Sequence, residues 1–285
     1  MSHTVEQLAN EFKAAGIRPS GILLIHTSLS SLKTPTTPPP SPDMVIDALL
    51  LALGPEGTLL IPTLSYLFVS EASPHFDVRA TPTNLGAIPA AMLRRPGVVR
   101  SLHPTHSVAA LGRLARELTC GHREDRTPVG PNSPFSLVAR LNGQVAFLGC
   151  GARCNTSIHG VEETVLPRPP PYLLRPGTVR YRVVDEAGAV EEVEHRRHDF
   201  AGVAQRYERL RGMVPKGEYA QGRVGVAVLE VFEAPSMWAA ARRAVTADPE
   251  ALVARCAPGE EEDHHLKPAR GGEYFSYTVG PTPTG

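Results

Sequence analysis

The sequence has few of the features that would assign it to a specialised class of protein. It contains four cysteines in 285 residues, which is too few for a disulfide framework at this length. Cys150 and Cys154 are close together, but no second pair stands at the spacing of a zinc finger. We therefore expect reduced thiols at all four positions, and reduced thiols indicate the cytoplasm.

An excess of charge of one sign is also missing. Lys+Arg and Asp+Glu are both 29, so no net field attracts the chain to nucleic acid or to an anionic membrane. No apolar run is long enough to span a bilayer. Residues 1–16 lack the basic start and apolar middle of a signal peptide. We expect neither a nucleic-acid partner nor membrane insertion.

What is present is an ordinary globular composition with 42% hydrophobic residues. Apolar runs at 21–28 and 57–65 predict buried strands. Between them, Asp43 is expected to cap a helix that ends at Gly54. Strand, helix and strand in this order predict an α/β fold. A β-hairpin around 186–188 and a closing helix are expected near the end of a domain covering 1–256, with a disordered tail at 257–285.

The strand at 21–28 ends in His26, followed by a cluster of hydroxyl side chains up to Ser31. Ligands of open α/β sheets bind beyond the carboxyl ends of strands. Small residues there leave backbone N–H groups accessible, and hydroxyls add donors, which suits an anion such as a pyrophosphate. The alternative, that these residues only cap the next helix, is equally compatible with the sequence.

His103 and His106 stand three residues apart in the segment 101–112. They could form a metal pair or supply a general base. The other interpretation is a polar turn held by Pro104, with one histidine in a hydrogen bond. No acidic third ligand follows at a fixed spacing, so the pattern favours the turn over a metal site.

His159 and Glu162 are the strongest catalytic candidates. Their spacing places both side chains on one face of a helix. A carboxylate beside an imidazole holds its tautomer and raises its basicity, as general base catalysis requires. A pair on the solvated surface is the alternative. The position directly after a predicted strand ending in Gly149-Cys150-Gly151 favours the catalytic interpretation.

Five segments together resemble a known family. They are, in order, HTSLSSL, GTLLIPTLS, SLHPTHSVAALG, GPNSPFSLVARLNGQVAFLGCG and NTSIHGVEE. The chain resembles the aminoglycoside 3-N-acetyltransferase family of antibiotic N-acetyltransferases from about residue 5 to residue 245. The resemblance implies an α/β fold with a mixed sheet flanked by helices, and acetyl-coenzyme A as co-substrate.

The family pattern also implies roles for individual residues. Its hydroxyl-rich turn holds the phosphates of coenzyme A, although Lys33 replaces the family's glycine. A second motif implies coenzyme contacts by His103 and Ser107. A third places Thr156, His159 and Glu162 at the acetyl-transfer centre, where Thr156 or amides near 149–151 would stabilise the oxyanion. The turn that would bind the phosphates consists of His26, Thr27, Ser28, Leu29, Ser30 and Ser31.

Two departures from the family concern the acceptor. Many drug-acetylating members have an acid at the positions of His106 and Pro131. A polycationic sugar requires carboxylates, so their absence weakens the assignment to an aminoglycoside acceptor. We expect classical aminoglycosides either to be poor acceptors or to be bound by other acids, such as Glu124, Asp125 or Glu163.

The sequence thus predicts direct transfer of an acetyl group to an amino group of an aminoglycoside or similar amine. His159 would be the base, and no metal would be needed. One alternative is a zinc-dependent hydrolase using His103, His106 and His159. Another is a non-catalytic family member that binds a drug. The sequence leaves a homodimer open.

Overall fold

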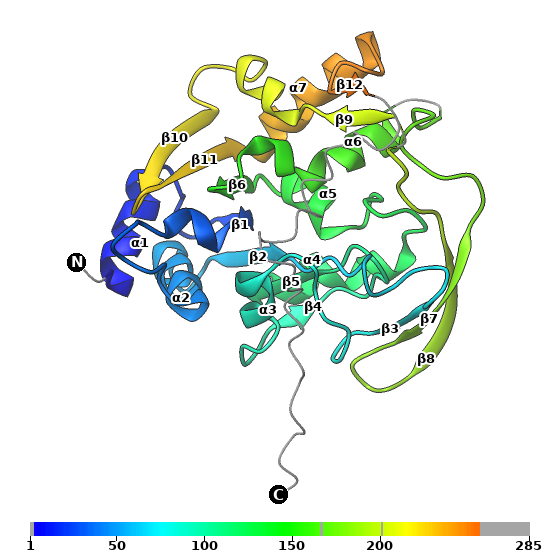
Figure 1. Cartoon of the computed structure of the whole chain (residues 1–285), viewed down its shortest axis with the longest axis horizontal. Helices are drawn as coiled ribbons and strands as arrows, with labels where there is room; N and C mark the ends of the chain where they lie inside the picture. The colour runs from blue at the N-terminus through cyan, green and yellow to red at the C-terminus, as the bar shows by residue number, and fades with distance from the viewer. Residues whose placement is uncertain (1–2, 166–167, 201, 257–285) are drawn as a thin grey trace, which may run out of the picture.

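The computed structural model describes residues 3–165, 168–200 and 202–256. Within them, seven strands form one mixed sheet in the order β10-β11-β6-β1-β2-β5-β4 (Figure 1). The central strands β6, β1 and β2 are parallel, and the outer pairings are antiparallel. The strands are β1 (Ile22–Thr27), β2 (Thr58–Pro62), β4 (Val99–Arg100), β5 (Val108–Gly112), β6 (Gln144–Leu148), β10 (Tyr219–Val224) and β11 (Ala227–Glu233).

Helices cover both faces of this sheet, so the central strands are buried at nearly every position rather than at alternate ones. Leu23 and Ile25 pack with the helices of one face, whereas Ile22 and Leu24 pack with those of the other. The first layer holds α1 (Val5–Ala14), α2 (Pro42–Leu53) and α3 (Ala87–Met92), and the second holds α4 (Ala115–Thr119), α5 (Pro134–Arg140), α6 (His159–Thr164) and α7 (Ala234–Ala247).

The predicted fold class is therefore confirmed, including the closing helix α7. The expected cap of the second helix is wrong. The helix begins at Pro42, and the Ser41 side chain accepts a hydrogen bond from the amide of Met44. Proline is suited to the first helical position, since its missing N–H would have no partner there, so the start moves ahead of Asp43.

A smaller sheet lies beside the main one and consists of β3 (His75–Asp77), β7 (Val179–Val184) and β8 (Val190–His195). Strands β7 and β8 form the predicted hairpin, which runs along one flank of the molecule (Figure 1). Its own apolar cluster contains Phe76, Tyr181 and Val193. A further two-stranded pair joins β9 (Val203–Gln205) to β12 (Val253–Arg255). The short 3-10 helices are η1 (Leu29–Leu32), η2 (Cys120–Glu124), η3 (Ala152–Cys154), η4 (Thr156–Ile158) and η5 (Tyr207–Gly212).

In the described part of the chain, no helix combines the length and apolarity needed to cross a membrane. The predicted tail at 257–285 lies outside the described residues, and the domain boundary at 256 stays a prediction.

The carboxyl ends of β1 and β6 meet at one edge of the main sheet. The Ser28 amide donates to the Leu148 carbonyl over 2.8 Å, which extends the pairing of the two strands by one bond. Gly149 follows with a positive φ of 73°. A Cβ at Gly149 would overlap the side chain of Ser31, so only glycine lets the two turns approach this closely.

This contact generates a stability prediction. Gly149→Ala must adopt a left-handed backbone and also displace Ser31, whereas Gly54→Ala meets only the backbone penalty, because its φ is 71° and its surroundings are open. We expect Gly54→Ala to lower the free energy of unfolding by about 1 to 2 kcal/mol, and Gly149→Ala to lower it further. Urea denaturation would measure both.

The Ser31→Gly change provides the control, since it removes the atoms that Gly149→Ala would overlap. It should restore part of the stability lost in Gly149→Ala and none of that lost in Gly54→Ala. Equal losses in the two alanine variants would contradict a steric role for Gly149.

Candidate active site

The predicted catalytic pair is formed at the start of α6. The Nδ1 atom of His159 lies 3.1 Å from Oε2 of Glu162. His159 is 4% exposed and Glu162 is fully buried, so the pair is not a solvated surface pair. The short helix follows β6 through η3 and η4, which brings it to the edge where the parallel strands end.

Two tyrosine hydroxyls complete the environment of Glu162. The Tyr207 hydroxyl lies 2.9 Å from Oε2 of Glu162 and 2.9 Å from Nδ1 of His159. The Tyr172 hydroxyl lies 3.2 Å from Oε1. Burial and the nearby Glu162 carboxylate raise the pKa of Tyr172 and hold the pKa of Tyr207 well above its usual value. Both phenols therefore keep their protons and remain donors.

This network sets the tautomer of His159. A carboxylate is an acceptor, so the Nδ1 atom facing Glu162 carries the proton. The Nε2 atom is then left with its lone pair. A buried imidazole oriented in this way can remove a proton from a neighbouring group, and the Glu162 charge stabilises the imidazolium that results.

A second acid–imidazole pair stands beside the first. The Nε2 atom of His198 lies 2.7 Å from Oε1 of Glu163, which also accepts from the Val129 amide over 3.0 Å. The His198 and His159 rings meet edge to face, with centroids 4.6 Å apart. The ring of Phe200 contacts both histidines. Burial raises the pKa of Glu163 to about 7, and burial followed by the nearness of His159 lowers the pKa of His198.

The sequence reasoning missed Tyr207, Tyr172 and His198. The two tyrosines stand among ordinary residues, so the sequence does not mark them as functional. His198 could have been noticed, because His195 and His198 stand three residues apart after a predicted strand, the same spacing that drew attention to His103 and His106.

His103 and His106 form the polar turn that the sequence favoured. The Nδ1 atom of His103 accepts the amides of Thr105 and His106, and its Nε2 lies 3.3 Å from the Thr127 carbonyl. Both nitrogens of His103 are therefore engaged by the backbone. Its ring stacks on His122, and burial holds its pKa well below the ordinary value.

No metal-binding geometry emerges from this cluster. Among the residues described by the structure, no group of three or more histidine, cysteine, aspartate or glutamate side chains is arranged to hold an ion. His195 packs edge to face on His103 with ring centroids 4.6 Å apart, and His106 packs in the same way on His198.

The hydroxyl-rich turn after β1 forms as predicted. The Ser28 and Ser30 hydroxyls lie 3.2 Å apart at its partly exposed rim, while Ser31 donates to the Ser28 carbonyl over 2.6 Å. His26 is buried and its ring stacks on Phe147. Leu29 is partly buried, and its side chain packs against the core. Ser31 thus shapes the turn, and Ser28 and Ser30 form its open surface.

Two buried hydroxyls lie close in sequence to the predicted ligand sites without a hydrogen bond. Within the described residues, Oγ1 of Thr27 and Oγ1 of Thr156 have no partner. A buried unpaired hydroxyl costs free energy unless a ligand or water satisfies it. By contrast, the amide of Gly149 already donates to the Val228 carbonyl, which removes it from the donors expected near 149–151.

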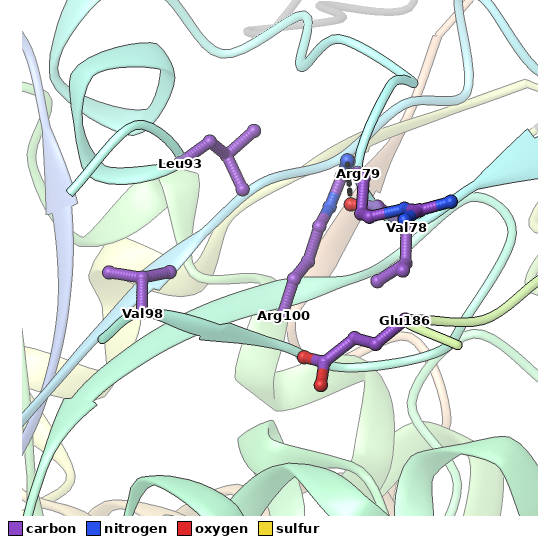
Figure 2. A pocket seen from close by; sticks show the side chains of 6 residues that line it. All are labelled: Val78, Arg79, Leu93, Val98, Arg100 and Glu186. Atoms are coloured by element: carbon purple, nitrogen blue, oxygen red, sulfur yellow. Dashed lines mark hydrogen bonds between the residues drawn. The ribbon is translucent and has the colours of Figure 1, made fainter. Parts of the chain in front are cut away.

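Ser107 is fully buried and belongs to an arginine-centred network. Its hydroxyl lies 2.9 Å from Nε of Arg100 and 2.9 Å from the Thr63 carbonyl. Figure 2 shows Arg100 beside a pocket of about 160 Å³ that is lined by Val78, Arg79, Leu93, Val98, Arg100 and Glu186. The guanidinium donates to backbone carbonyls, including that of Val78. This pocket is far too small for a nucleotide, and its buried cation serves the fold.

The predicted acceptor carboxylates also have internal partners. Asp125 is 4% exposed and accepts from the backbone and side-chain amides of Asn132, which fixes the turn at 130–133. Burial nevertheless raises its pKa to about 6. Glu163 is the nearer of the two to the catalytic histidine, because His198 contacts both Glu163 and His159.

Comparison with known proteins agrees with this geometry. The model of the aminoglycoside 3-N-acetyltransferase family matches residues 24–246. Aminoglycoside N(3)-acetyltransferase IV of Salmonella sp. is 32% identical over 249 residues, which cover 85% of this chain and 87% of that protein.

Two solved structures share the fold. A histidine-to-alanine variant of aminoglycoside acetyltransferase AAC(3)-IVa in complex with a gentamicin superposes with a TM-score of 0.72 at 26% identity, covering 88% of this chain and 92% of that one. A binary complex of AAC-IIIb with coenzyme A has a TM-score of 0.71 at 23% identity, over 85% and 95% of the two chains.

The match of the family model over most of the chain, together with the relative that is 32% identical over 85% of it, establishes the relationship. This chain is a member of the aminoglycoside 3-N-acetyltransferase family.

Proposed function

We propose that the protein transfers an acetyl group from acetyl-coenzyme A to an amino group of an aminoglycoside or similar amine, with His159 as general base. The observation that carries the mechanism is the buried His159–Glu162 pair, reinforced by two tyrosines, in a member of this family. Relatives are named for N-acetylation of aminoglycosides, and one related structure contains coenzyme A.

The bound amine is mostly protonated at neutral pH, and it must lose one proton before its nitrogen can attack. The neutral nitrogen attacks the thioester carbonyl, a C–N bond forms, and the C–S bond breaks to release the coenzyme thiol. His159 would take the second proton from the nitrogen at Nε2 and deliver it to sulfur, while the first proton ends in solvent. Glu162 would hold the ring and stabilise its positive charge.

The coenzyme is assigned to the turn after β1. The Ser28 and Ser30 hydroxyls and nearby amides suit its phosphates. Thr27 and Thr156 offer buried hydroxyls without partners among the described residues, and Thr156 is the better placed in sequence to stabilise the oxyanion. The coenzyme contacts expected of His26, His103 and Ser107 stay predictions, as their side chains are buried.

The acceptor is assigned to the side of His198 and Glu163. The Glu163 carboxyl contacts His198, which lies next to His159. The pKa of Glu163 is about 7, so the carboxyl carries negative charge at and above neutral pH. The Asp125 oxygens already accept hydrogen bonds from the Asn132 amides, so Asp125 would attract a cationic acceptor through its negative charge and without direct contact.

The alternatives find less support. A zinc hydrolase would need His103 as a ligand, and both of its nitrogens are engaged. A non-catalytic drug-binding protein would not need the buried His159–Glu162 pair. A cytoplasmic location and a homodimer stay predictions. The location is inferred from the reduced state expected of the four cysteines and from acetyl-coenzyme A as co-substrate.

The catalytic prediction concerns His159 and Glu162. His159→Ala should lower turnover by about 10²- to 10⁴-fold, the usual contribution of a positioned base. Glu162→Gln should cost less, because the imidazole remains. Release of coenzyme thiol from acetyl-coenzyme A, with gentamicin as acceptor, measures the turnover of both variants.

Tyr181→Phe is a matched control, since it also removes a buried polar atom but belongs to the hairpin cluster. Its turnover should stay near that of the unchanged protein. Near-normal turnover of a folded His159→Ala variant would move the base elsewhere.

The coenzyme prediction concerns the turn after β1. Replacing Ser28 and Ser30 together with leucine removes the hydroxyls and covers the amides, whereas the core-facing Leu29 and Leu32 remain. The affinity for coenzyme A, measured by calorimetry, should fall at least about 10-fold, because each hydrogen bond to a charged group contributes about 1.5–3 kcal/mol. Unchanged affinity in a folded double variant would place the phosphates at another site.

A further inference from the structure

Two consecutive residues of α6 each hold a histidine. Glu162 holds His159 through Nδ1, and Glu163 holds His198 through Nε2. His198 comes from the segment after β8, so the second pair is assembled from parts of the chain that are far apart in sequence. The Glu163 side chain is 2% exposed and that of His198 is 8% exposed, which excludes a loose surface contact.

The two carboxylates leave one unprotonated ring nitrogen on each histidine for a ligand. When Glu163 is ionised, as it is above its pKa of about 7, it accepts from Nε2 of His198, so Nδ1 has the lone pair. On His159 the lone pair is on Nε2. Within the residues that the structure describes, neither of these two atoms has a hydrogen-bond partner, and the rings that carry them touch edge to face at 4.6 Å.

The proposed reaction needs two proton acceptors. An ammonium and a thioester become an amide, a thiol and one free proton. The nitrogen therefore loses two protons, of which one ends on sulfur and the other in solvent. A single imidazole can hold only one of them at a time, so His159 alone would have to release the first proton before it could take the second.

From the geometry we infer that His198, held by Glu163, is a second catalytic base that takes the first proton from the bound ammonium. His159 then removes the second during attack and delivers it to the coenzyme sulfur. This inference rests on the proposed function. It gives the acceptor an ammonium site made of two imidazole lone pairs, between helix α6 and the segment that follows the β7–β8 hairpin.

The surroundings of His198 agree with this role. The titratable groups that face it are Glu163 and His159 from α6 and His106 from the segment before β5. Burial, followed by repulsion from a charged His159, holds the pKa of His198 well below the ordinary histidine value. The ring is therefore neutral at neutral pH, and its lone pair is available.

The test is the pH profile of kcat/KM for acetyl transfer to gentamicin. If the ring of His198 must be neutral, its ionisation adds one unit to the slope of log kcat/KM on the acid side, in addition to the ionisation of Glu163, whose pKa is about 7. His198→Gln keeps an N–H for Glu163 but removes the titrating ring. It should lower the slope by one unit and lower kcat/KM by about 10²-fold. Affinity for coenzyme A by calorimetry should stay unchanged.

His195→Gln is the matched control, since His195 lies three residues away, is also buried and contacts His103 instead of His159. It should retain the slope of the unchanged protein. His198→Asn provides a second route if His198→Gln does not fold, and it should likewise lower the slope by one unit.

The outcomes separate the two proposals. If the unchanged protein transfers no acetyl group from acetyl-coenzyme A to gentamicin or to other amines, the proposed function is wrong and this inference is wrong with it. Transfer by the unchanged protein, with the same slope and rate in a folded His198→Gln or His198→Asn variant, overturns the inference alone.

Discussion

Removing an ionised carboxylate from water costs several kcal/mol unless hydrogen bonds and charge replace the lost hydration. Glu162 is fully buried, and its partners within the described residues are one imidazole and two phenols. The arrangement of the neighbouring segments supplies the hydrogen-bond donors that the Glu162 carboxylate needs. Tyr207 and Tyr172 come from separate segments beyond α6, and their hydroxyls bring those segments onto the helix that carries His159.

The same constraint explains why the histidine is rigid. Its ring is bounded by Tyr207, His198 and Phe200, with centroid separations of 5.5, 4.6 and 4.8 Å. Packing on three sides and a hydrogen bond on the fourth leave the imidazole little rotational freedom. A base that is already oriented requires little rearrangement before it reacts, which is how buried polar networks contribute to catalysis.

Local patterns in the sequence were enough to predict His159 with Glu162, the strand ends and the hydroxyl-rich turn. These features depend on neighbours three or four residues apart or on strand periodicity. Tyr207 and His198 could not be predicted, because their roles depend on how distant segments pack. The cap at Asp43 failed since Pro42 competes for the start of the helix. Asp125 illustrates a further limit: a carboxylate suited to a cation can equally well fix a turn.

The separate small sheet has a consequence for how this protein can change over evolutionary time. The residues around His159 are shared between two structural units, with α6 on the main sheet and His198 just beyond the β7–β8 hairpin. The hairpin has its own apolar cluster and pairs within the main sheet nowhere in the described residues. Insertions or substitutions in it can therefore reshape the wall of the site next to His198 while the Glu162 network stays intact.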